Sequence, residues 1–121
     1  MTPSDRILEC TFFVPLRRDR SLSDGAKHKP RLWEWLDEEL FYRFGGGTVA
    51  PGKYSGFYMD PDTGKKVTDQ CYMYIVAIPE EGLQSLRDLL RTVCKQFAQK
   101  CVYLSVTGEV EFIRVDDGNS S

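Results

Sequence analysis

The sequence predicts an α+β fold of the ferredoxin-like kind. Its elements follow the order βαββαβ with an additional C-terminal strand, and we expect two helices on one face of an antiparallel sheet. Three observations predict this fold. Two segments carry leucines at helical spacing, five segments are apolar over strand-like lengths, and each helical segment stands between two strand-like ones. With 121 residues, the chain has the length of one domain with its own core.

The first strand is predicted over Ile7–Val14, where alternate residues point to opposite faces of the sheet. Pro15 ends it, and residues 15–30 form a long basic loop, a length typical of functional lids or mobile linkers. Leucines at every fourth position then predict a helix over Pro30–Phe44. It begins at a proline, which suits a first helical turn, and stops at three glycines.

The second half of the chain repeats the alternation of strands and helices. The predicted elements are a strand over Thr48–Met59, a turn at Asp60–Gly64, a strand over Val67–Ile78, a helix over Glu80–Lys100, a strand over Cys101–Val106 and a strand over Glu109–Val115. We expect residues 1–115 to form the single domain and residues 116–121 to be a disordered tail.

Composition excludes several classes of protein. A hydrophobic share of 41% is too high for a disordered chain, and no apolar run is long enough to span a bilayer. The net charge of −2 argues against a surface that binds nucleic acid throughout. The N-terminus has no basic start followed by an apolar stretch, so we expect a cytoplasmic protein with reduced cysteines. The four cysteines form no C-x-x-C pair and there is one histidine, so we expect no metal and no cofactor.

The sheet face away from the helices is the first candidate site. If the apolar residues of the first strand meet the helices, Glu9 and Thr11 lie on this open face, together with Tyr103 of the fourth strand. The third strand presents either Tyr72, Tyr74 and Val76 or Cys71, Met73 and Ile75, and we favour the tyrosines. An aromatic face of this kind fits a homodimer or protein partner, a small-molecule pocket with Glu9 as base or anchor, or stacked single-stranded nucleic acid. The acidic isoelectric point of 5.4 counts against nucleic acid.

The basic loop is the second candidate site. Its anion-contact candidates are Arg17, Arg18, Arg20, Lys27, His28 and Lys29. A local excess of positive charge in an acidic protein could receive a phosphate or carboxylate, although charge runs are more often solvated, mobile loops. A lone loop histidine is more often a surface residue than a catalytic one.

Two aromatic residues on the first helix, Trp35 and Tyr42, lie off its leucine stripe. Either the basic loop folds over this pair, with arginine stacked on the indole, or the pair forms a second contact surface. We favour the loop.

Short motifs connect the chain with a group of known sequences. They are Gly56-Phe57-Tyr58-Met59-Asp60 followed by Thr63-Gly64, then Phe97-x-Gln99-x-x-Val102 leading to Val110-x-Phe112. Over about Ile7 to Ile113 the chain resembles small bacterial domains of unknown function. The resemblance implies a ferredoxin-like fold and no activity.

Our leading hypothesis from the sequence is a small cytosolic module that self-associates or binds a protein partner through the tyrosine-rich sheet face. The alternative is a small ligand-binding protein or enzyme of the dimeric α/β-barrel kind, with a pocket on the same face. We expect a homo-oligomer or protein partner, consider a small-molecule ligand compatible, and expect neither nucleic acid nor membrane as a partner. The sequence leaves open whether the protein is an enzyme.

Overall fold

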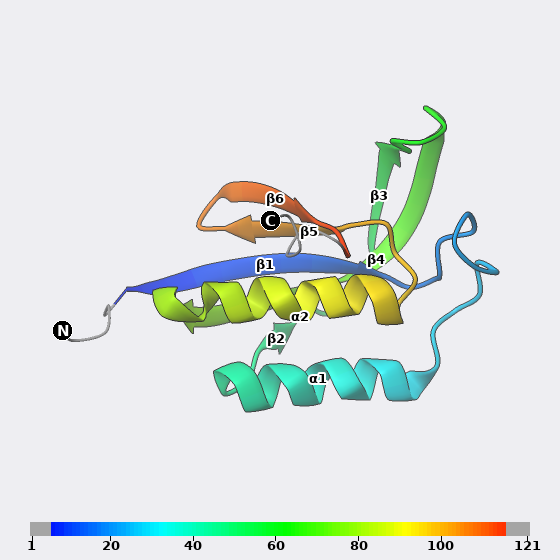
Figure 1. The fold of residues 1–121 in the computed structure, drawn as a ribbon. Coiled ribbons are helices and arrows are strands. Elements are labelled where there is room, and N and C mark those ends of the chain that lie inside the picture. The colour runs from blue at the N-terminus through cyan, green and yellow to red at the C-terminus, as the bar shows by residue number, and fades with distance from the viewer. Residues whose placement is uncertain (1–5, 116–121) are drawn as a thin grey trace.

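The computed structural model describes residues 6–115. It contains two α-helices packed on a six-stranded antiparallel sheet (Figure 1). The elements in chain order are β1 (Ile7–Pro15), α1 (Pro30–Phe44), β2 (Thr48–Val49), β3 (Tyr54–Met59), β4 (Lys66–Pro79), the 3₁₀ turn η1 (Glu80–Gly82), α2 (Leu83–Gln96), β5 (Val102–Val106) and β6 (Glu109–Ile113). The prediction of an α+β fold with two helices on an antiparallel sheet is confirmed. The predicted disordered tail, 116–121, lies outside the described residues.

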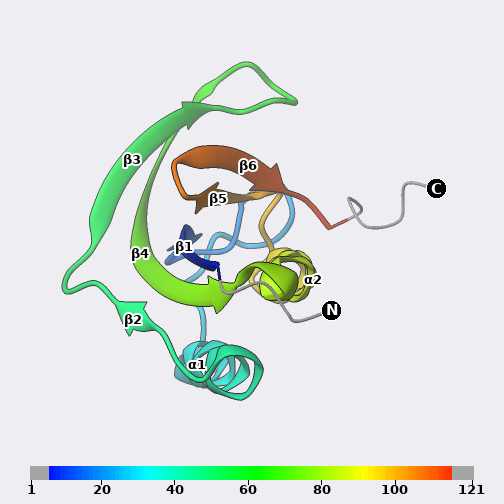
Figure 2. The same ribbon diagram turned by 90° about the vertical axis from the view of Figure 1, so that its left-hand side faces the viewer.

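The sheet has the order β2-β4-β1-β5-β6, and β3 pairs with β4 beyond β2. Strand β4 pairs with three strands, β1, β2 and β3, along its 14 residues. Its second half pairs with β1, from Pro15 opposite Cys71 to Ile7 opposite Pro79, while its first half pairs with β3. Figure 2 shows β4 curving strongly between these two partners. The β3–β4 hairpin therefore projects beyond the part of the sheet that the helices cover (Figure 1).

The core lies between the helices and one face of the central strands. Alternate residues of β1 are at most 4% exposed, as the predicted alternation requires. The helices contribute their leucine stripes, and one continuous apolar cluster results. Its main members are Leu8, Cys10, Phe12, Val14, Leu36, Leu40, Val76, Ile78, Leu86, Leu90, Val93 and Leu104. Each fully buried side chain of this size contributes about 1.5–3 kcal/mol, so the cluster is the main source of stability.

Glycine and proline decide where the elements end. Gly45, at φ +83°, caps α1 with its N–H bonded to the carbonyls of Leu40 and Phe41, as predicted. The single strand predicted over Thr48–Met59 is instead interrupted, because Pro51 lacks an N–H for the ladder and Gly52 turns the chain at φ +84°.

The second helix is shorter than the predicted range, Glu80–Lys100, and spans Leu83–Gln96. A 3₁₀ turn precedes α2, and the helix stops at Gln96 because Ala98 takes a left-handed conformation at φ +50°. No helix within residues 6–115 is long and apolar enough to cross a membrane.

Candidate functional site

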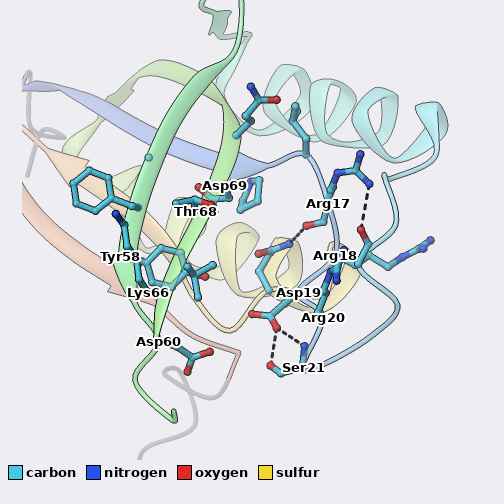
Figure 3. Close-up of a pocket in the computed structure, with 18 of the residues that line it drawn as sticks. Arg17, Arg18, Asp19, Arg20, Ser21, Tyr58, Asp60, Lys66, Thr68 and Asp69 are labelled. Carbon is cyan, nitrogen blue, oxygen red and sulfur yellow. Dashed lines mark hydrogen bonds between the residues drawn. The ribbon is translucent and has the colours of Figure 1, made fainter. Parts of the chain in front are cut away.

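A groove of about 1030 Å³ separates the basic loop from the β3–β4 hairpin. Figure 3 shows Arg17, Asp19 and Arg20 on the loop side, facing Tyr58 and Asp69 on the hairpin side. Seven basic residues and three carboxylates line the groove. They are Arg17, Arg18, Arg20, Lys27, Lys53, Lys65, Lys66, Asp19, Asp60 and Asp69. The groove thus carries a surplus of positive charge, and it joins two segments that are distant in the sequence.

The loop wall is folded by its own backbone. Residues Arg17 and Lys27 form an antiparallel bridge, and the N–H of Arg18 donates to the carbonyl of Ala26 at 2.9 Å. The loop is also tied to the end of α2, because Gln99 Nε2 donates to the carbonyl of Arg17 at 2.7 Å. The N–H of Asp19 donates to the carbonyl of Ala98 at 2.9 Å. The loop therefore forms an ordered wall, in contrast to the solvated, mobile loop that its charge suggested.

A turn and an ion-pair group hold the hairpin wall in place. Asp60 Oδ1 accepts hydrogen bonds from the backbone N–H groups of Asp62 at 2.8 Å and Thr63 at 3.3 Å, as expected for a turn begun by aspartate. Lys100, which lies beyond α2, bonds both Asp60 oxygens at 3.1 Å and Asp62 at 2.8 Å. The Asp62 N–H and then Lys100 lower the pKa of Asp60, and Asp62 and Asp60 raise that of Lys100.

Asp69 is the distinctive carboxylate of the groove. It is half-buried in β4, and burial raises the pKa of its carboxyl group. Its side-chain partner is the Cys71 thiol, at 3.5 Å. Among the described residues, no Lys or Arg forms an ion pair with it. Asp69 lies opposite Gly56 in β3, where a side-chain Cβ would stand 3.9 Å from Asp69 Oδ1. The glycine therefore leaves the carboxylate uncovered.

Tyr58 completes this part of the groove. Tyr58 pairs with Val67 across the β3–β4 hairpin, and Gly56 pairs with Asp69 two residues away along each strand. Both pairs therefore lie on the same face of the hairpin. Burial and then the negative charge of Asp69 raise the pKa of Tyr58 to about 12. Near neutral pH the phenol stays protonated and can donate a hydrogen bond. Asp69 and Tyr58 can together present a carboxylate, a hydroxyl donor and an aromatic ring to one ligand.

Neither of these residues was a candidate from the sequence. In the sequence, Tyr58 and Gly56 belong to a short motif, and Asp69 lies within a predicted strand. A usable signal was present, since an aspartate inside a strand that becomes apolar from Tyr72 onward is unusual. What the sequence could not show is that Gly56 stands directly across from it.

The predicted tyrosine face is wrong in part. Tyr74 is only 2% exposed and stacks on Phe12 with ring centroids 5.0 Å apart, so it belongs to the core beneath the helices. Tyr72 has the same parity in β4 and packs against Trp33 on that side. The open face instead carries the alternative set, Cys71, Met73 and Ile75, because Met73 and Ile75 pair with Phe13 and Thr11 of β1.

Glu9, Thr11 and Tyr103 do lie on the open face, as predicted from alternation. Glu9 is exposed, and Thr11 is paired in the sheet with Ser105. Tyr103 joins an edge-to-face series of rings with Phe13 and Phe112. None of the three predicted residues lines the groove, so the structure does not bring them together with Tyr72 and Tyr74 into one pocket.

The anion-contact candidates divide into three groups. Arg17, Arg18, Arg20 and Lys27 line the groove, although Arg18 is engaged with Asp24 at 3.1 Å. Lys29 is exposed at the start of α1 and lines neither the groove nor the smaller cavity beside it, which measures about 360 Å³.

His28 corrects the sequence interpretation of a surface residue. It is 7% exposed, its Nε2 lies 3.0 Å from the carbonyl oxygen of Pro15, and its ring packs edge-to-face on Trp33 and Phe97. Burial lowers its pKa. It therefore fastens the end of the loop to the core as a neutral ring.

Trp35 and Tyr42, which the sequence suggests lie together beneath the basic loop or on one contact surface, have different environments in the structure. Trp35 is half-buried, packs against the core and lies 6.4 Å from the ring of Phe97. Tyr42 is 77% exposed and contacts Phe41, so the basic loop does not cover it.

Within residues 6–115, no group of three or more His, Cys, Asp or Glu side chains is placed so that it could hold a metal ion. All four cysteines are free thiols. Cys10 and Cys94 are buried, and Cys71 and Cys101 are half-buried.

Comparison with known proteins gives one informative result. No protein-family model matches the chain, and no curated protein matches it. Among the solved structures that match, two cover most of the chain. A phage SAM lyase in complex with S-methyl-5′-thioadenosine superimposes with a TM-score of 0.69 and 15% identity, covering 97% of this chain and 96% of that one. A phage SAM lyase in the apo state has a TM-score of 0.60 and 17% identity, with 88% of each chain covered.

These neighbours overturn the leading sequence hypothesis. That hypothesis was a protein-binding or self-associating module, whereas the similar structures are those of an enzyme. They agree better with the alternative, a small ligand-binding protein or enzyme. They also share a small α+β fold with the chain, which agrees with the predicted fold class. They do not confirm the resemblance to small bacterial domains of unknown function.

Proposed function

We propose that this chain is a small enzyme that cleaves a sulfonium nucleoside of the S-adenosylmethionine class and releases the methylthioadenosine part. The proposed site is the groove between the basic loop and the β3–β4 hairpin. The observation that carries the proposal is Asp69, a half-buried carboxylate without a basic partner among the described residues, in a chain similar over 97% of its length to a SAM lyase. The ferredoxin-like arrangement of the strands is part of the same proposal.

The size of the groove supports a ligand of this class. Its volume of about 1030 Å³ lies at the upper end of the range for small-molecule sites, about 300–1,000 Å³. Such a ligand has a flat base, a ribose and a short amino-acid chain, so it needs an elongated site with groups of different chemistry. The groove supplies aromatic rings and a carboxylate on the hairpin side, and basic side chains on the loop side.

Asp69 is suited to hold the sulfonium. Burial raises its pKa because no neighbouring cation compensates its charge. A sulfonium bound within about 4–6 Å supplies the missing positive charge, which lowers the pKa and favours the ionised carboxylate. The ring of Tyr58 adds an aromatic surface on which the base or the sulfonium can lie, and its hydroxyl adds a donor.

The proposed cleavage requires no strong acid or base. Methylthioadenosine keeps the methyl group and the ribose carbon, so the bond that breaks joins sulfur to the methionyl chain. The electron pair of that bond stays on sulfur, which leaves as a neutral thioether, while the carboxylate of the methionyl chain bonds to the carbon that sulfur leaves and closes a lactone. No proton is transferred in this step. The tasks of Asp69 and the groove are then to bind the sulfonium, orient the chain and keep water away.

The test is direct detection of methylthioadenosine after incubation with S-adenosylmethionine. We expect turnover by the wild-type chain and a loss of about 100-fold in kcat/KM for Asp69→Asn, since the charge is removed while the shape is kept. Asp37→Asn, on α1 and away from the groove, is the matched control and should keep wild-type activity. Absence of product with the wild-type chain, or full activity in Asp69→Asn, would contradict the proposal.

A further inference from the structure

A second cavity adjoins the groove and has a different character. It measures about 360 Å³ and shares Leu16, Lys27 and Lys53 with the groove. The remainder of its lining is His28, Pro30, Trp33 and Tyr72. It thus combines rings with two lysines, and its volume is within the range of small-molecule sites, about 300–1,000 Å³.

The ring wall of this cavity is fixed and uncharged. Trp33 contacts both His28, with centroids 5.6 Å apart, and Tyr72, at 5.0 Å. His28 is held in turn by Pro15, whose carbonyl oxygen lies 3.0 Å from Nε2. Since burial lowers its pKa, His28 is neutral near pH 7. The rings meet edge-to-face and form an apolar wall, and a planar ligand ring can pack against one of them.

The two lysines at the junction carry charge that the chain itself does not balance. Arg18 pairs with Asp24, and Lys100 pairs with Asp60 and Asp62, but no carboxylate of residues 6–115 forms an ion pair with Lys27 or Lys53. They come from separate segments, the basic loop and the connection between β2 and β3, and line the same two cavities. An anionic group between them would be favourable to both.

The start of α1 adds to this positive potential. Pro30 and Trp33 belong to its first turn, which contains no acidic residue. The N-cap residue, Lys29, makes no side-chain capping hydrogen bond. The positive end of the helix dipole therefore has no negative partner from its own first turn.

We propose that this second cavity binds a planar aromatic anion, such as a nucleoside monophosphate, with its ring on the His28–Trp33–Tyr72 wall and its acid group between Lys27 and Lys53. This site goes beyond the proposed cleavage reaction. Methylthioadenosine has the ring but no acid group, so it lacks the part that the lysines would recognise. Occupancy of the second cavity therefore adds a binding activity that the cleavage reaction does not require.

The experiment measures binding of adenosine monophosphate through quenching of the fluorescence of Trp33 and Trp35, with calorimetry as a second readout. Adenosine and ribose 5-phosphate serve as probes that each lack one part of the ligand. We expect each to bind at least about tenfold more weakly than adenosine monophosphate. The double variant Lys27→Gln/Lys53→Gln should lose about tenfold in affinity for adenosine monophosphate, and Lys95→Gln, an exposed lysine on α2, should lose none.

Two outcomes would overturn the proposal. The first is no saturable binding of adenosine monophosphate by the wild-type chain at millimolar concentration. The second is equal affinity in the double variant and in Lys95→Gln. Asp69→Asn separates the two sites, because it should lower kcat/KM for S-adenosylmethionine about 100-fold while leaving adenosine monophosphate binding unchanged. If the wild-type chain cleaves nothing but binds adenosine monophosphate through the lysines, the proposed function fails and this inference stands.

Discussion

The two halves of strand β4 differ as much as any two regions of this molecule. From Cys71 onward it pairs with β1 and buries its alternate residues beneath the helices, whereas from Lys66 to Cys71 it pairs with β3, in which every residue is exposed. The first region carries the core. The second carries Asp69, and its partner strand β3 carries Tyr58. Core residues must be shielded from solvent, whereas a carboxylate that binds a ligand must be accessible. One strand can contain both because it extends beyond the helices.

The largest effect should come from a substitution in the core region. Leu90→Ala removes a fully buried leucine of α2 and should lower the free energy of unfolding by about 3 kcal/mol. Phe57→Ala removes a residue that is 74% exposed in β3 and should change it by less than about 0.5 kcal/mol. Urea unfolding of the two variants measures the difference. Equal losses would mean that the hairpin is part of the cooperative core.

His28 lies where the two regions meet and should make stability depend on pH. Its pKa in the folded chain is lowered, mainly by burial, so the unfolded chain binds a proton more readily. The free energy of unfolding should therefore be greatest above the unfolded pKa of about 6.5 and fall as the pH drops below it.

The variant His28→Phe isolates this contribution. It should lose about 1 kcal/mol at roughly pH 8, because the bond to Pro15 is absent, and it should lose less than the wild-type chain on acidification to roughly pH 5.5. Denaturation at the two pH values measures both effects. An identical pH dependence in the two proteins would show that His28 is not the titrating group.

The smallest effect should come from the edge of the sheet. Arg87 of α2 donates to both carboxylate oxygens of Glu111 in β6, at 2.9 and 2.8 Å, and this pair fixes the helix to the last strand. Both side chains are about 30% exposed, so Glu111→Gln should cost about 0.5–1 kcal/mol at neutral pH.

The stabilisation by the Arg87–Glu111 pair should decrease in acid, because it requires the ionised carboxylate of Glu111. Arg87 lowers the pKa of Glu111, so the stabilisation is present above the ordinary glutamate pKa and is lost as the pH falls through the lowered value. Glu111→Gln should therefore approach wild-type stability in acid. A gap that stays constant at all pH values would point to packing rather than charge.

Periodicity predicted the core because it is a local property of the chain. The alternation in β1 and the leucine stripe of α2 identify their buried faces without any knowledge of partners. For β4 the same rule left two faces possible, and the tyrosines were assigned to the wrong one. Aromatic residues on a strand fit either face, so only the register with β1 decides between them.

The candidate site was predictable only on its basic side. The loop was singled out by its charge, and Arg17, Arg20 and Lys27 do line the groove. Asp69 was missed because its significance depends on what lies across from it. Gly56 and the basic loop reach it through strand pairing and loop folding, which join positions far apart in the sequence.

The class of fold, the buried stripes of β1 and α2 and the surplus of positive charge in the loop follow from residue types and their spacing along single segments. The extension of β4 past the helices, the burial of His28 and the position of Asp69 in a groove facing the loop follow from the folded arrangement of the chain. Each of these depends on contacts between distant segments, whose geometry follows from register and packing rather than from residue type.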